Sequence, residues 1–136
     1  MKKIILPGLL AGLLMLIVGF VVSWVFGLIF PGLNAEYASG IFRAWQDPIM
    51  MLYFLYPFVL GICFAGVWGL SKGKFKGTLW QRGAKFGLFV WAVFSIPGML
   101  VTYSSFVVSL TMIFSWLVMG LANGVVAGWV FAKMNR

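Results

Sequence analysis

Four apolar stretches dominate the chain, and each is long enough to cross a membrane as a helix. They cover approximately residues 4–30, 48–70, 84–103 and 106–132. The hydrocarbon layer of a bilayer is about 30 Å thick, and a helix needs about 20 residues to span it. The stretches lack the alternation of polar and apolar residues typical of membrane barrel strands. The sequence therefore predicts an all-α membrane protein, with four transmembrane helices in one bundle over residues 1–136.

The composition excludes a soluble globular domain. Hydrophobic residues make up 63% of the chain and charged residues only 9%, whereas soluble domains are about 25% charged. The net charge of +8 does not indicate nucleic-acid binding, because the basic residues gather beside the apolar stretches rather than on one polar surface.

The basic residues predict how the helices are oriented. All of them except Arg43 fall in the N-terminus, in the loop 71–85 or in the C-terminus, with no acidic residue among them. Short cytoplasmic loops are rich in lysine and arginine. We therefore expect both termini and the loop 71–85 in the cytoplasm, the loop 31–47 outside, and two in–out–in hairpins.

The basic loop SKGKFKGTLWQRGAK has aromatic residues between its charges, which is typical of an interfacial segment. Its predicted contacts with anionic lipid headgroups are Lys72, Lys74, Lys76, Arg82 and Lys85. The loop contains no phosphate-binding glycine motif.

Small residues recur at helical spacing on three of the stretches. They are Gly8 and Gly12, then Gly61, Ala65 and Gly69, and finally Gly120, Gly124 and Gly128. Such faces let helix backbones approach closely in lipid. Four helices can bury only part of these faces, so we expect the protein to self-associate or to join a larger membrane complex.

Little in the chain can support catalysis, metal binding or cofactor binding. There is no histidine, the single cysteine Cys63 lies inside a span, and Glu36 and Asp47 are the only acidic residues. The stretches 4–30, 48–70, 86–103 and 106–132 contain no charged residue, so no ion relay is expected. We expect no enzyme activity, no catalytic residue, no metal and no cofactor. An enzyme that uses Glu36 or Asp47 at the outer interface is the weaker alternative.

The outer half of the bundle is the place where a binding site is expected. It carries bulky aromatic residues, two prolines and most of the hydroxyl groups, whereas the glycine faces lie in the inner half. This asymmetry predicts a bundle that is narrow inside and open outside, with a cavity for a lipid or small apolar molecule. The candidate residues are Glu36, Arg43, Trp45, Asp47, Tyr53, Tyr56, Ser95 and Thr111. The alternative is that the aromatic rings fill the wider end and face lipid.

Two residues of this set have simpler explanations. Asp47 precedes a proline and a long apolar run, the pattern of a helix N-cap. Arg43 has no role in orienting the helices, so it is expected to pair with Glu36 or Asp47, or else to bind an anionic headgroup or partner.

The start MKK with GLLAG, followed by FRAWQDPIMMLYFLYPFVLG, resembles small four-helix proteins of prokaryotic membranes whose function is unknown. The resemblance implies a multi-pass protein of the inner (plasma) membrane of a prokaryote. It implies no activity and no functional residues.

Overall fold

The structure is a computed structural model that describes residues 2–135, apart from the side chains of Lys2, Lys3 and Lys72. No strand occurs among the described residues. The helical elements, in chain order, are α1 (Lys2–Ile29), α2 (Gly32–Tyr37), the 3-10 turn η1 (Pro48–Met50), α3 (Met51–Ser71), the 3-10 turn η2 (Lys72–Lys74), α4 (Leu79–Val90), the π-helical turn η3 (Trp91–Ser95), α5 (Ile96–Ser105) and α6 (Leu110–Met134).

Four helical runs are long and apolar enough to cross a membrane. They are Ile4–Ile29, Pro48–Ser71, Leu79–Ser105 and Leu110–Met134. The predicted all-helical fold and its four long apolar helices are thereby confirmed.

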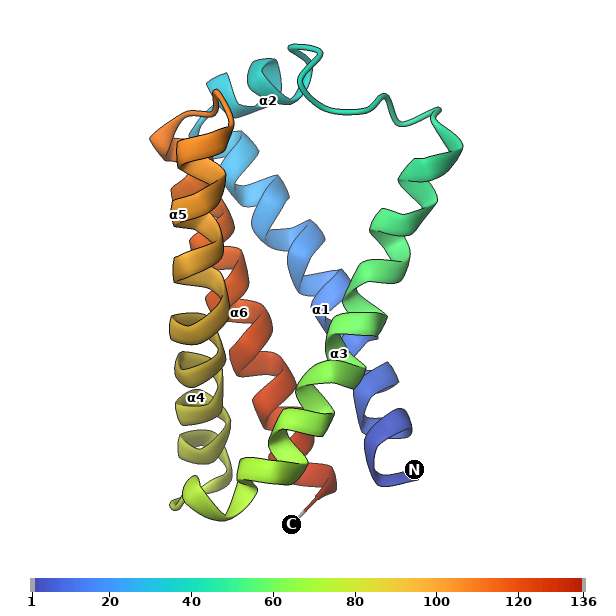
Figure 1. Ribbon diagram of the computed structural model, residues 1–136, viewed down its shortest axis with the longest axis vertical. Coiled ribbons are helices and arrows are strands. Elements are labelled where there is room, and N and C mark those ends of the chain that lie inside the picture. Colours follow the sequence, from blue (N-terminus) through green and yellow to red (C-terminus); the bar gives the residue numbers. More distant parts are fainter. Residues whose placement is uncertain (1, 136) are drawn as a thin grey trace.

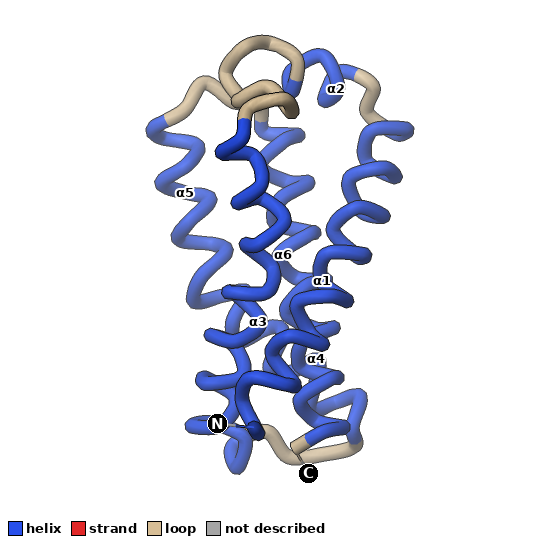
Figure 2. Tube along the Cα trace, turned by 90° about the vertical axis from the view of Figure 1, so that its right-hand side faces the viewer, coloured by secondary structure: helices blue, strands red, loops and turns tan. Residues whose placement is uncertain are grey.

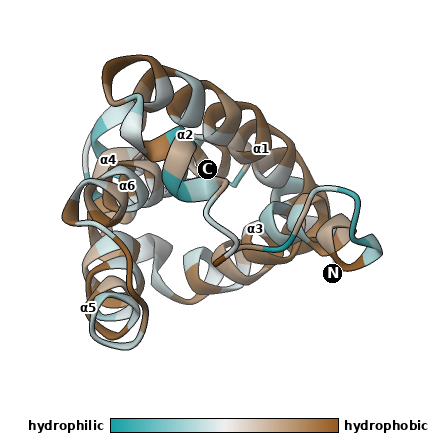
Figure 3. Cartoon of the chain, turned by 90° about the horizontal axis from the view of Figure 1, so that it is seen from above, coloured by the Kyte–Doolittle hydropathy of each residue, from teal (hydrophilic) through white to brown (hydrophobic). Residues whose placement is uncertain are grey.

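The connections gather at the two ends of the bundle (Figures 1 and 2). The end of the bundle that holds both chain termini and the segment 72–78 is called the basic end. The opposite end, which holds the segments 30–47 and 106–109, is called the loop end. Seen from the loop end, hydrophobic residues cover most of the helices (Figure 3). The membrane side that each end faces stays a prediction.

Two of the long helices begin at other residues than the approximate predicted spans, because side-chain caps set their first residues. The third long helix begins at Leu79 rather than at 84, since Thr78 and Gln81 form a reciprocal capping box. The fourth begins at Leu110 rather than at 106, since the Ser109 hydroxyl accepts the N–H of Met112 at 3.1 Å.

The third long helix contains a widened turn beside its proline. The N–H of Ile96 donates to the carbonyl of Trp91, five residues earlier, as in a π-helix. Pro97 has no N–H, so one carbonyl of the preceding turn loses its ordinary helical partner. The indole N–H of Trp91 donates to the carbonyl of Leu117 at 2.8 Å, which ties the widened turn to α6.

Glycines bring the helices of each hairpin into backbone contact near the basic end. In the first hairpin, a Cβ on Gly8 would lie 2.7 Å from the Cα of Ile62, and one on Gly61 would collide with the carbonyl of Gly8. In the second hairpin, a Cβ on Gly128 would lie 2.9 Å from the Cα of Gly83. Since α1 also packs on α6, these two close pairs form one bundle.

An aromatic cluster fills the core at the basic end. The side chains of Trp68, Phe86 and Phe131 are fully buried and contact one another. Phe75 from the basic segment stacks on Trp68, with 5.9 Å between the ring centroids. The sequence predicts aromatic residues of this segment in the headgroup region. Phe75 instead packs against the core.

Candidate functional site

The loop end is held together by the carboxylate of Glu36. One of its oxygens accepts the backbone N–H of Ser109 at 2.7 Å, and the other accepts the Ser109 hydroxyl at 2.7 Å. Ser109 is the N-cap of α6, so a negative charge lies at the positive end of that helix. Glu36 therefore joins α2 to the start of α6, and this is a structural role.

Further contacts place α2 across the loop end (Figure 1). The Tyr37 hydroxyl accepts the indole N–H of Trp116 at 2.8 Å, and the Asn34 amide donates to the carbonyl of Gly27 at 3.3 Å. Leu33 is buried beneath them. Burial raises the pKa of Tyr37, so its hydroxyl stays protonated at neutral pH.

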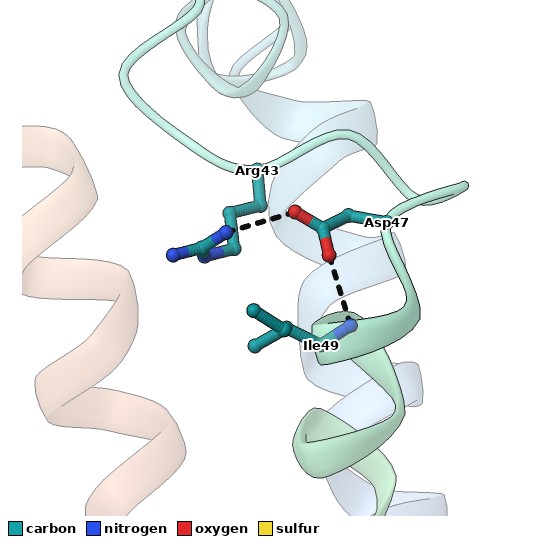
Figure 4. Close-up of polar contacts among 3 residues, drawn as sticks. All are labelled: Arg43, Asp47 and Ile49. Atoms are coloured by element: carbon teal, nitrogen blue, oxygen red, sulfur yellow. Dashed lines mark hydrogen bonds and ion pairs between the residues drawn. The ribbon is translucent and has the colours of Figure 1, made fainter.

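Arg43 pairs with Asp47, one of the two partners that the sequence predicted for it. The guanidinium Nη1 lies 2.8 Å from Oδ2 of Asp47, and Oδ1 accepts the N–H of Ile49 at 2.9 Å (Figure 4). The Ile49 N–H first, and Arg43 second, lower the pKa of Asp47, so the carboxylate is charged at neutral pH. Asp47 caps the helix start as expected.

The first six residues of α3 have little protein around them. Every side chain from Met51 to Tyr56 is between 37% and 69% exposed, and successive residues of a helix point about 100° apart. The exposed surface therefore runs around the whole circumference of the helix. The chief ring contacts of this part join Trp45 to Tyr53 at 5.7 Å and Phe20 to Phe54 at 6.2 Å.

None of the candidate cavity residues lines either of the two hollows described below. Ser95 lies in the π-helical turn with its hydroxyl beside Gly120, Thr111 is half-buried in the first turn of α6, and Tyr56 is exposed. The two best-formed hollows among the described residues are lined by other side chains.

The larger hollow is an apolar groove at the loop end, which we call the loop groove. Its volume is about 230 Å³, and its lining residues are Ile41, Phe42, Thr102, Phe106, Val108 and Trp116. The second hollow lies under α2, and at about 20 Å³ it has room for about one water molecule. No local sequence pattern predicts the loop groove, because its walls come from three segments that are separate in the chain.

Arg43 lies in the chain between the loop groove and the exposed part of α3. It directly follows Ile41 and Phe42 in the chain, and its guanidinium extends under the loop, away from α3 (Figure 4). The loop end thus combines an apolar groove, an exposed apolar helix and one exposed ion pair. Such a surface can bind an amphiphile, with its polar part at the ion pair and its chain in the groove.

The predicted lipid contacts at the basic end differ in their surroundings. Lys74 and Lys76 are exposed, and the Lys85 ammonium donates to the carbonyl of Lys76 at 2.9 Å. Arg82 is half-buried, with its guanidinium carbon 5.4 Å from the centre of the Trp68 ring. The side chain of Lys72 lies outside the described part of the structure.

Comparison with known proteins gives no relative from which a function can be transferred. No protein-family model, no curated protein and no solved structure matches the chain.

Proposed function

We propose that this protein is a non-enzymatic, multi-pass membrane protein that binds one lipid or similar apolar amphiphile at its loop end. The observation that carries the proposal is the exposure of Met51–Tyr56 around the whole of α3, at the same end of the bundle as the loop groove. A helix end with so much exposed apolar surface needs further apolar neighbours, and in a membrane lipid chains supply them.

The size of the loop groove supports a chain rather than a compact ligand. Ligand pockets usually measure about 300–1,000 Å³ and enclose most of a drug-sized molecule. At about 230 Å³, lined chiefly by apolar side chains, the groove suits a length of acyl chain while the rest of the lipid stays in the membrane.

The charge pattern supports one orientation. With the positive-inside rule, the basic end faces the cytoplasm of a prokaryotic cell, and the loop groove faces the outer leaflet. Lys74 and Lys76, which are exposed at the basic end, then meet anionic headgroups there.

Filling the loop groove is expected to displace the lipid. The side chain of Ile41 lines the groove and is 48% exposed, so Ile41→Trp places a large ring in it without removing a buried residue. We expect native mass spectrometry in mild detergent to show one retained lipid on the wild type and several-fold less on this variant.

Leu70→Trp is the control for that experiment. Leu70 is 91% exposed on α3 near the basic end, so the same ring is added far from the groove. Lipid retention equal to the wild type is expected for this variant. Equal retention on Ile41→Trp as well would show that the lipid does not use the loop groove.

Self-association is a second candidate function. The glycine faces suggest it, and one exposed face of α3 favours it. Most of the predicted packing glycines already contact a helix of the same chain. On α3, however, Val59, Cys63 and Leu70 are exposed at helical spacing, and a Cβ on Gly66 or Gly69 would meet open space. The two glycines let the backbone of a second copy approach this face of α3 closely.

Cys63 provides the test of this face. If two copies pack through it, a short bifunctional thiol reagent applied to membranes is expected to give a covalent dimer on a denaturing gel. Cys63→Ser should abolish the dimer, because Cys63 is the single cysteine of the chain. Monomer alone, both on that gel and in the native mass spectrum, would contradict self-association through α3.

A further inference from the structure

The ion pair of Arg43, which directly follows Phe42 of the loop groove in the chain, with Asp47 has no net charge. Of the charged side chains in the loop 31–47, Glu36 has both oxygens bound to Ser109. Arg43 and Asp47 remain, and they bind each other at 2.8 Å. A headgroup that reaches this position therefore meets one positive and one negative group side by side.

Both partners are exposed enough to form further hydrogen bonds. The Arg43 side chain is 58% exposed and the Asp47 side chain 28% exposed. A guanidinium has five N–H donors, and Asp47 contacts only Nη1. A carboxylate has about four acceptor positions, of which Arg43 and the Ile49 N–H take two. The unused nitrogens of Arg43 point away from Asp47 (Figure 4).

We propose that the headgroup bound here is a zwitterion that carries a phosphate and a primary ammonium, as in a phosphatidylethanolamine. This inference rests on the proposed function, since it names the headgroup of the lipid whose chain lies in the loop groove. Arg43 donates to the phosphate oxygens, for which a planar guanidinium is well suited. The ammonium donates to the carboxylate of Asp47, so each charge of the lipid meets its opposite.

Two other common headgroups match the pair less well. A phosphatidylglycerol has a phosphate but no ammonium, so it brings its negative charge to Arg43 and leaves the Asp47 carboxylate unpaired beside it. A phosphatidylcholine has a quaternary ammonium without an N–H, so it donates no hydrogen bond to Asp47. The ion pair thus selects for both charge and hydrogen-bond donation.

A competition among these three lipids tests the inference. The protein is reconstituted with equal amounts of phosphatidylethanolamine, phosphatidylglycerol and phosphatidylcholine that have identical acyl chains. Native mass spectrometry then identifies and quantifies the lipid that the protein retains. We expect the ethanolamine lipid to exceed each competitor about fivefold, which is the upper range for one exposed ion pair.

Two substitutions assign this preference to the pair. Asp47→Asn removes the charge, while the asparagine oxygen still caps the helix through the Ile49 N–H. It is expected to abolish the advantage over phosphatidylglycerol. Arg43→Gln is expected to reduce retention of the ethanolamine and glycerol lipids together. Lys133→Gln, which removes one positive charge at the other end of the bundle, is the control and should keep the wild-type preference.

The outcomes separate the two proposals. Retention of all three lipids in equal amounts, a preference for either competitor, or a preference that survives Asp47→Asn would overturn the headgroup inference and leave the lipid site standing. A wild-type protein that retains no lipid at all would contradict the proposed function itself.

Discussion

Replacing Gly61 by alanine is expected to destabilise the protein strongly, whereas the same replacement at Gly69 is expected to be neutral or stabilising. A Cβ on Gly61 would collide with the carbonyl of Gly8 and lie 2.9 Å from the N of Gly12. These are backbone atoms, so the two helices have to separate. Overpacking of this kind costs about 1–3 kcal/mol, and loss of the shared α1–α3 contact places Gly61→Ala at the upper end.

Gly69 makes the comparison specific. It lies on the same helix, and a Cβ added there meets open space, with no atom of another helix within 4 Å. Alanine is about 0.5–1 kcal/mol better than glycine inside a helix, so Gly69→Ala reports propensity alone. Thermal unfolding in one detergent, followed by tryptophan fluorescence, measures both variants. Equal shifts of the two midpoints would mean that α1 and α3 are not in backbone contact.

Replacing Glu36 by alanine is expected to release the loop end without unfolding the bundle. The change removes both hydrogen bonds to Ser109. Hydrogen bonds to charged groups contribute about 1.5–3 kcal/mol, and exposure to water at the loop end places this pair in the lower part of that range. Since Ser109 still caps α6 through its own hydroxyl, the loss should fall on α2 and on the segment that follows it.

Hydrogen–deuterium exchange measures this release. Faster exchange is expected for residues 32–46 in Glu36→Ala, with α3 and α6 unchanged. Glu36→Gln keeps one acceptor oxygen and should give an intermediate rate. Unchanged exchange in both variants would show that Glu36 does not hold α2 on α6.

The sequence predicts those parts of the fold that depend on local patterns. Hydropathy alone predicts the four long helices, because burying so many apolar residues in a bilayer leaves few alternatives. The dipeptide Asp47-Pro48 predicts a helix start, and the carboxylate does cap that start. The capping-box spacing of Thr78 and Gln81 also indicates the early start of the third helix. The charges of Arg82 and Lys85, however, are typical of a loop between membrane spans.

Parts that depend on distant residues could not be predicted in the same way. Spacing shows that Gly61 lies on a small-residue face, but it does not show that Gly8 and Gly12 lie opposite. The contact between Glu36 and Ser109 joins residues 73 positions apart. The loop groove combines a loop, the end of α5 and the start of α6, and its shape follows from how these segments pack.

The most direct test of lipid binding at the loop end is an experimental structure of the protein in a lipid nanodisc. We expect density for an acyl chain in the loop groove, next to Phe106 and Trp116, with headgroup density beside Arg43. We also expect the Met51–Tyr56 part of α3 to stay apart from α5. A groove closed by α3 packing directly on α5, with no lipid density near Arg43, would contradict lipid binding at the loop end.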